Sequence, residues 1–332
     1  MKISRRTILA AGAALATMTA AGPAFAASEY TLRIHTLVKS PHPYNDMAEA
    51  MKAEIEEASD GRVEVRIFDS GQLGQDPAVI GEMAFGTIDI MISTTSNAVQ
   101  QIPEFGIFTM PYLFGGMDEA LAAVGPGTDV HAHFEQVYAD RGVGMKLLAL
   151  GGSGTRNMST KSVPIEGPAD LAGLKMRTPP SPMDSKTWAA FDMLPVTVAW
   201  GELYAAMQTG VAEAMESSLP GYTGSKLYEV APNLALTEHT VQLNHTSISE
   251  ITWNKLPEDL QQIVEEAAIS ANIYGVEQAK GYDAALVETL QTDHGVTVTR
   301  PDKQAFMEVL APLQVELAES LDLATEYALL KQ

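Results

Sequence analysis

Residues 30–37 read YTLRIHTL, and this stretch begins the pattern that decides the fold. Leu32, Ile34 and Thr36 share one face of the stretch, because they alternate with residues that point the other way. Such a period of two is typical of a β-strand with one buried side. The sequence therefore predicts a strand at the start of the folded chain.

The sequence that follows keeps alternating between helical and strand patterns. Apolar residues at helical spacing over 44–59 are followed by a period-two pattern over 63–67. A helix is then expected to begin at Asp76, with the Asp76 side chain as its N-cap, before a short apolar run over 88–92. This order is typical of helices covering a mainly parallel sheet, so we predict the α/β fold class.

A second unit with the same alternation begins near the Gly-rich stretch 151–154, which we interpret as a flexible loop. Its expected elements are strands over 174–177, 196–199 and 211–215, helices over 186–191 and 202–209, a long helix over 257–290 and a last helix over about 302–323. Two α/β units predict a two-lobed, periplasmic-binding-protein-like fold, with a ligand cleft between the lobes and the long helix spanning them. We assign 27–153 plus about 242–281 to lobe I, 154–241 plus about 282–322 to lobe II, and 323–332 to a C-terminal tail.

The first 26 residues have the features of an export signal. Basic residues Lys2, Arg5 and Arg6 precede a small and apolar run over 8–21 and an Ala-x-Ala pattern that ends at Ala26. That run is too short and too rich in Ala and Gly to be preferred as a membrane-spanning helix. The arginine pair also resembles a twin-arginine signal, so both the Tat and the Sec routes remain open. Cleavage after Ala26 places the mature chain in the periplasm.

The composition excludes several classes of protein. The chain has 332 residues, 46% of them hydrophobic and 19% charged, which is typical of a globular protein. It has no cysteine, so disulfides, thiolate metal sites and catalytic thiols are excluded. The formal net charge is −21, and −24 without the leader, which argues against nucleic acid and anionic membranes as partners. We expect a soluble monomer with no membrane insertion.

Catalytic motifs are hard to find in this sequence. It contains no H-E-x-x-H, no G-x-S-x-G, no P-loop and no G-x-G-x-x-G that opens a helix. His131 and His133 lie two residues apart on a predicted helix and point to different faces, so we expect them at the surface and not in a metal site. We therefore predict no catalytic residues, no metal and no cofactor. An extracytoplasmic α/β enzyme that acts on small organic acids remains the alternative.

Arginine is scarce and therefore informative. The expected mature chain has seven, at positions 33, 62, 66, 141, 156, 177 and 300. Arg156 follows the Gly-rich stretch, and Arg177 ends a predicted strand, where α/β folds place ligand-binding groups. A guanidinium presents a planar fork that matches a carboxylate through two parallel hydrogen bonds. On these residues alone, surface or salt-bridged arginines remain the alternative.

Several stretches, read together, resemble one family, the solute-binding proteins of TRAP (tripartite ATP-independent periplasmic) transporters, the DctP-like family. The matching stretches are GQLG at 71–74, GTIDI at 86–90, PEFG at 103–106, MPYLF at 110–114, PADLAGLKMR at 168–177, ELYAAMQTGV at 202–211, SKLYEV at 225–230 and Leu-Pro at 256–257. Their order and spacing agree across essentially the whole mature chain.

The resemblance implies a two-lobed binding protein that closes around a small organic anion. Such a protein delivers a carboxylate, sugar acid, or keto or dicarboxylic acid to membrane permease subunits, for uptake driven by an ion gradient. Arg177 falls on the family's carboxylate-clamping arginine and Arg156 on its second ligand-facing arginine. Ser217 stands after Glu216, where the family often has Asn, and its hydroxyl offers one donor where an amide offers two. A sulfonate ligand and a sensory role also remain open.

Other candidates for the cleft follow from their positions in the resemblance or beside these motifs. They are His35, Gln72, Asp76, Asn157, Trp200, Tyr222 and Asn244. Trp200 stands where the family commonly has an aromatic residue near the ligand, although a core aromatic residue under the 202–209 helix is an equal alternative. The sequence does not name the solute.

Overall fold

The computed structural model describes residues 28–331, so the predicted export signal over 1–26 lies outside the described residues. The strands are β1 Tyr30–Thr36, β2 Val63–Phe68, β3 Ile90–Thr94, β4 Met145–Thr160, β5 Lys175–Thr178, β6 Leu194–Thr197, β7 Ala214–Ser218, β8 Asn233–Ser249 and β9 Thr297–Thr299. The helices are α1 Pro43–Ala58, α2 Asp76–Ala84, α3 Met117–Val124, α4 Asp129–Arg141, α5 Pro182–Ala189, α6 Leu203–Thr209, α7 Leu219–Gly224, α8 Glu250–Trp253, α9 Glu258–Thr292, α10 Lys303–Leu310, α11 Gln314–Glu319 and α12 Ala324–Leu330. The predicted α/β class is confirmed.

One mixed sheet runs through the described part of the chain, in the order β2-β1-β3-β8-β4-β7-β5-β6, with β9 paired to β8. At one end, here lobe I, β1 pairs in parallel with β2 and β3. At the other end, lobe II, β5 pairs in parallel with β6 and β7. The expected parallel arrangement thus holds within each lobe. The two central strands, β4 and β8, are antiparallel to each other and join the lobes.

The Gly-rich stretch 151–154 lies inside β4, so the prediction of a flexible loop is wrong. The register between β4 and β8 shifts between Gly152 and Thr155, where the long strands cross from one lobe to the other. A Cβ atom on Gly151 would lie 2.6 Å from Asn272 Oδ1 of α9, and Gly154 has a φ of +119°. The lack of a side chain at Gly151 therefore allows α9 to pack closely against β4, and the positive φ of Gly154 fits the irregularity in the β4–β8 pairing.

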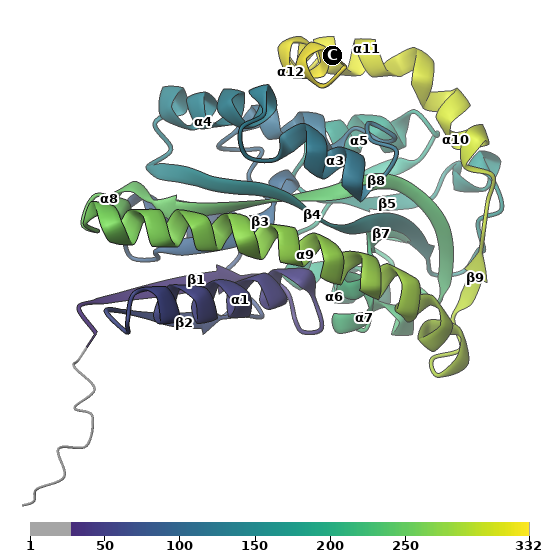
Figure 1. The fold of residues 1–332 in the computed structure, drawn as a ribbon. Coiled ribbons are helices and arrows are strands. Elements are labelled where there is room, and N and C mark those ends of the chain that lie inside the picture. The colour runs from purple at the N-terminus through teal and green to yellow at the C-terminus, as the bar shows by residue number, and fades with distance from the viewer. Residues whose placement is uncertain (1–27, 332) are drawn as a thin grey trace, which may run out of the picture.

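Helix α9 is the long helix that the sequence predicts, and it is continuous over 35 residues. At 1.5 Å per residue it is about 52 Å long. It runs beside α1 and β4 and reaches both lobes (Figure 1). Gly275 lies inside this continuous helix, and a Cβ atom there would lie 1.9 Å from the Met47 side chain of α1, so glycine permits the close packing of the two helices.

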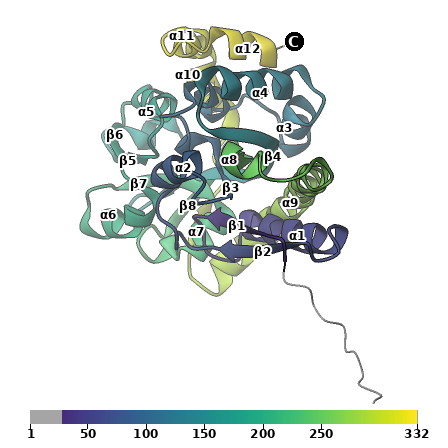
Figure 2. The ribbon, with the colours of Figure 1, turned by 90° about the vertical axis from the view of Figure 1, so that its left-hand side faces the viewer.

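The C-terminal part differs from the single helix expected over 302–323. Helix α10 passes through a 3₁₀ turn, Ala311–Leu313, into α11, because Pro312 has no amide hydrogen to continue the helical pattern. Within the stretch assigned to a tail, Ala324–Leu330 forms α12, which lies against α4 (Figure 2). The Nε2 atom of His133 is 2.8 Å from Glu326 Oε1 of α12.

Separate apolar clusters support the two ends of the sheet. In lobe I, the buried face predicted for β1 packs with Met47 and Met51 of α1 and with α9. In lobe II, one cluster includes Leu203 and Met207 of α6, and another surrounds Trp188 of α5. Burial of each large apolar side chain contributes about 1.5–3 kcal/mol. The lobe boundaries given above stay a prediction. Within residues 28–331, no helix combines the length and apolar character needed to cross a bilayer.

Candidate functional site

A small cavity lies where the carboxyl ends of the parallel strands of both lobes meet. Its free volume is about 40 Å³, counted as space open to the centre of a water-sized sphere. The lining residues come from both lobes and from the crossing strands: Leu37, Val38, His42, Tyr44, Asp76, Thr94, Ser96, Asn97, Arg156, Arg177, Pro179, Trp200, Ser217, Ser218, Gly221 and Gln242. Open α/β sheets bind ligands at this edge, so the cavity is the candidate site.

Arg177 of β5 is a buried cation with few partners. It is only 2% exposed, and its Nε donates to the Val198 carbonyl at 3.0 Å. Its Cζ lies 5.7 Å from the centroid of the Trp200 ring. Within residues 28–331, no acceptor lies within hydrogen-bond distance of its Nη atoms. Burial lowers the pKa of Arg177 to about 10, so the group stays charged at neutral pH. In the described part of the chain it has no paired counter-ion.

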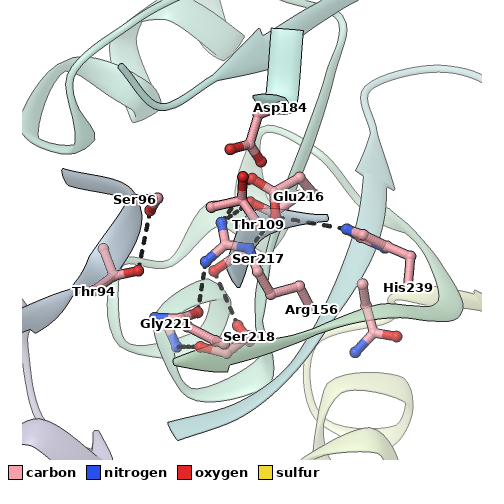
Figure 3. Close-up of polar contacts among 12 residues, drawn as sticks. Thr94, Ser96, Thr109, Arg156, Asp184, Glu216, Ser217, Ser218, Gly221 and His239 are labelled. Atoms are coloured by element: carbon pink, nitrogen blue, oxygen red, sulfur yellow. Dashed lines mark hydrogen bonds and ion pairs between the residues drawn. The ribbon is translucent and has the colours of Figure 1, made fainter. Parts of the chain in front are cut away.

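Arg156 of β4 lies in the same cavity but is already paired. Its Nε and Nη2 donate to the two carboxylate oxygens of Glu216, and the Nη2–Oε1 distance is 2.7 Å. Figure 3 shows Glu216 between Arg156 and His239, whose Nε2 is 3.7 Å from Oε2. Burial opposes both charges, but each partner stabilises the other, so the pKa of Arg156 is raised and that of Glu216 is lowered. Arg156 and Glu216 thus form a neutral pair.

A hydrogen-bonded chain continues from Arg156 into lobe I. Arg156 Nη1 donates to Gln242 Oε1 at 2.5 Å, and Gln242 Nε2 donates to Tyr44 Oη at 2.9 Å. Ser153 Oγ lies 3.2 Å from Tyr44 Oη and donates its one hydrogen to the Gln242 carbonyl at 3.1 Å. Tyr44 Oη thus accepts from Gln242 and can donate its own hydrogen to Ser153 Oγ, so the chain joins the cavity wall that Tyr44 lines to the crossing strands.

His42 adds polarity to the same wall but no charge. It is the N-cap of α1, and its Nδ1 accepts from the Tyr44 amide at 3.2 Å. Burial, and then the positive charge of Arg156, lower the pKa of His42 to about 3. The ring is neutral at pH 7, with its proton on Nε2.

Asp76 gives the lobe I wall its carboxylate. The prediction that Asp76 is an N-cap is wrong: Gln75 is the N-cap of α2, and the Asp76 side chain turns inward instead. His35 Nε2 lies 3.0 Å from Oδ1, Asn97 Nδ2 donates to Oδ2 at 2.7 Å, and Ser93 Oγ donates to the same oxygen. Three converging donors match the acceptor-only bonding of an ionised carboxylate.

Asp184 of α5 lies beside the Arg156–Glu216 pair (Figure 3). Its Oδ2 is buried and has no hydrogen-bond partner among the described residues. Burial, and then the negative charge of Glu216, raise the pKa of Asp184 to about 6. The ionised form of Asp184 at pH 7 therefore lowers the stability of the fold.

The sequence-predicted residues divide into two sets by position. Arg177, Arg156, Ser217, Trp200 and Asp76 line the cavity, and Ser217 Oγ donates to the Ser218 carbonyl at 3.0 Å. The other five candidates do not line it.

Each of those five has a position that explains its contacts. Gln72 is exposed and donates to Asp69 at 2.8 Å, and His35 is buried behind Asp76. Asn157 accepts from the Glu238 amide at 3.1 Å, Tyr222 donates to the Ala231 carbonyl at 2.6 Å in the lobe II core, and Asn244 donates to Asn272 of α9 at 2.7 Å.

Sequence reasoning missed His42, Tyr44 and Gln242. His42 and Tyr44 flank the start of α1, just beyond the carboxyl end of β1, and that position is a signal that could have found them. Gln242 lies in β8, where polar side chains are buried on both faces of a central strand. No period-two alternation marks such a strand, so its sequence carried no comparable signal.

Comparison with known proteins agrees with this architecture. The family model described as bacterial extracellular solute-binding protein, family 7 (DctP), matches residues 34–320. A solute-binding protein of Sulfitobacter sp. strain NAS-14.1 is 30% identical over 88% of this chain and 88% of its own. The sialic acid-binding periplasmic protein SiaP of Vibrio cholerae is 27% identical, over 93% of this chain and 94% of its own.

Two solved structures have the same fold over most of their length. A TRAP periplasmic solute-binding protein from Bordetella bronchiseptica, with density assigned to pantoate, has a TM-score of 0.84 and 27% identity, and 90% of this chain and 98% of that one are covered. One from Polaromonas sp. JS666 bound to D-erythronate also has a TM-score of 0.84, with 25% identity, 91% of this chain and 98% of that one. This chain belongs to family 7 of the bacterial extracellular solute-binding proteins, the DctP family of TRAP solute-binding proteins.

Proposed function

We propose that this protein captures a small organic acid in the periplasm and delivers it to the permease subunits of a TRAP transporter. One observation carries the proposal: Arg177 is a buried residue that lines a cavity between two lobes, and its Nη groups have no acceptor within the described residues. A carboxylate supplies both the counter-charge and the two acceptors that this fork lacks.

The remaining cavity residues take distinct roles in this proposal. Arg177 clamps the carboxylate, and the Trp200 ring covers the guanidinium. Ser217 and Tyr44 supply hydroxyl groups at the cavity wall. Arg156 acts mainly as a positioning residue, because Glu216 and Gln242 already occupy its donors. The relatives support the ligand class, since pantoate and D-erythronate are both carboxylic acids.

A thermal-shift screen against a panel of organic acids tests the proposal. The mature protein should be stabilised by about 2.7 kcal/mol at a ligand concentration 100 times its Kd. The bound acid should be recovered chemically unchanged after prolonged incubation, as expected of a binding protein and not of the alternative enzyme. If no organic acid shifts the unfolding temperature, the proposed function is wrong.

A further inference from the structure

We infer that the ligand is a compact monocarboxylic acid of two to four carbons that carries a hydroxyl group, and that dicarboxylates and hexuronates are rejected. The inference rests on the proposed function and adds the charge, the polarity and the size of the acid. It follows from three properties of the cavity: one unpaired cation, one carboxylate on the opposite lobe, and a small free volume.

The charges on the cavity wall allow for one ligand carboxylate. Arg156 is neutralised by Glu216, and His42 carries no charge at pH 7. Arg177 is then the one cation of the described cavity wall without an acidic partner. A single carboxylate matches it, and Asp76 opposes a second one because like charges repel strongly in a poorly solvated site.

Asp76 instead calls for a hydrogen-bond donor on the ligand. An ionised carboxylate has about four acceptor positions. Side chains of the protein fill three of these positions, namely those of His35, Ser93 and Asn97. Since Asp76 lines the cavity, the remaining position is available to a ligand. A hydroxyl group is the neutral donor that an organic acid most simply provides.

The volume limits the size of the acid. A water-sized sphere itself occupies about 10–15 Å³, and the space open to the centres of such spheres is only about 40 Å³, so the cavity admits no more than a few waters side by side. Covalently bonded atoms pack more closely than separate waters, so this space suits an acid with two to four carbons. A six-carbon uronic acid needs a larger cavity.

Titration calorimetry on the mature protein with size-matched acids tests each property. The probes are L- and D-lactate, propionate as lactate without its hydroxyl, malonate as a dicarboxylate of similar size, and galacturonate as a large hydroxy acid. One lactate enantiomer should bind at least about tenfold more tightly than propionate, because the lost hydrogen bond is to a charged group. Malonate should bind at least about a hundredfold more weakly than lactate, and galacturonate should give no measurable heat.

Each failure has a separate meaning. Malonate binding as tightly as lactate overturns the charge argument, propionate matching lactate overturns the role of Asp76, and tight galacturonate binding overturns the size limit. The proposed function survives all three results. If no acid in this panel binds but another acid stabilises the protein in the thermal-shift screen, this inference is lost and the proposed function stands.

A substitution at Asp76 assigns the effect to this residue. In Asp76→Asn the preference for lactate over propionate should fall at least fivefold, while malonate should bind more tightly than it does to the wild type. Asp118→Asn is the matched control, because Asp118 is an exposed acid on α3 and should leave all affinities unchanged. An unchanged lactate preference in folded Asp76→Asn overturns the inference, and the wild-type panel decides the question if that variant does not fold.

Discussion

The two sides of the cavity each hold an arginine, but the surroundings of the two arginines differ. On the side of the crossing strands, Arg156 is bonded to Glu216 and Gln242. On the β5 side, Arg177 has only the Val198 carbonyl and the Trp200 ring as protein partners within the described residues. The same side chain is thus a structural cation on one side and a free binding group on the other.

This difference shows that the partners of an arginine, more than its place in a cavity, decide its role. A buried guanidinium with a carboxylate partner contributes to the folded structure, and breaking that pair is costly. A buried guanidinium without such a partner is a cost to folding that a bound anion removes. We therefore expect substitutions on the two sides to separate ligand affinity from stability.

The largest effect is expected at Arg177. Arg177→Ala should weaken binding of the cognate acid by several hundredfold, corresponding to about 3–5 kcal/mol for loss of one partner of a buried charge pair. Arg177→Lys should recover little, since an ammonium lacks the fork geometry. Titration calorimetry measures both. Thermal unfolding of Arg177→Ala without ligand should be unchanged or shifted upward.

Arg66→Ala provides the matched control, because Arg66 is an exposed arginine that pairs with Glu64 on the surface of β2. Its affinity for the acid should equal that of the wild type. If the affinity of Arg177→Ala for the acid is within tenfold of the wild-type affinity, Arg177 is not the anion-binding group. The distinction between a free Arg177 and a paired Arg156 is then wrong.

The second effect concerns the paired side. Glu216→Gln leaves Arg156 buried without a counter-ion, which should lower the free energy of unfolding by about 3 kcal/mol. Differential scanning calorimetry without ligand should show a melting temperature lower by several degrees. The double variant Arg156→Met/Glu216→Met should regain most of this loss, because it removes both buried charges. A Glu216→Gln variant as stable as the wild type would contradict the structural role of this pair.

A smaller effect follows from the acid beside that pair. The folded-state pKa of Asp184, about 6, lies above its ordinary value, so the protonated form is favoured in the fold. The resulting penalty is present in full above pH 6 and fades as the pH falls toward 4. Asp184→Asn should therefore be more stable than the wild type at pH 7.5, by on the order of 2–3 kcal/mol, and progressively less so at lower pH. Chemical denaturation of both proteins at pH 7.5 and near pH 4 measures the difference in stability. A gain that is the same at the two pH values would refute the raised pKa of Asp184.

The smallest effect is expected at Trp200, which covers the free guanidinium. Trp200→Ala should weaken acid binding by roughly threefold to thirtyfold, the range for a cation–π contact. Trp200→Phe should fall between the wild type and Trp200→Ala, since the smaller ring attracts a cation less strongly. Calorimetry at constant ionic strength distinguishes the three proteins. Equal affinities in all three would limit Trp200 to a packing role.

Much of the fold could be predicted from local patterns. The alternation over 30–37 and the helical spacing over 44–59 correspond to β1 and α1 within one or two residues. The crossing strands could not be predicted in this way. The Gly-rich stretch 151–154 has the composition of a loop, and only contact with α9 and β8 keeps it extended.

The cavity was predictable in part. Arg177 ends one predicted strand and Trp200 follows another, and position alone places such side chains at a cleft. The pairing of Arg156 with Glu216 was not predictable, because the two residues are 60 positions apart and meet only when β4 pairs with β7. The position beyond a strand end indicates Tyr44, but it indicates Tyr222 after β7 as well, so this signal alone does not separate the cavity residue from the core residue.

A crystal structure of the protein with the tightest-binding acid of the panel tests the role of Arg177 most directly. We predict that both carboxylate oxygens lie within hydrogen-bond distance of the Arg177 guanidinium, while Arg156 stays bonded to Glu216. A carboxylate held by Arg156 after its release from Glu216, or bound with Arg177 turned into solvent, would contradict the division between a free and a paired arginine.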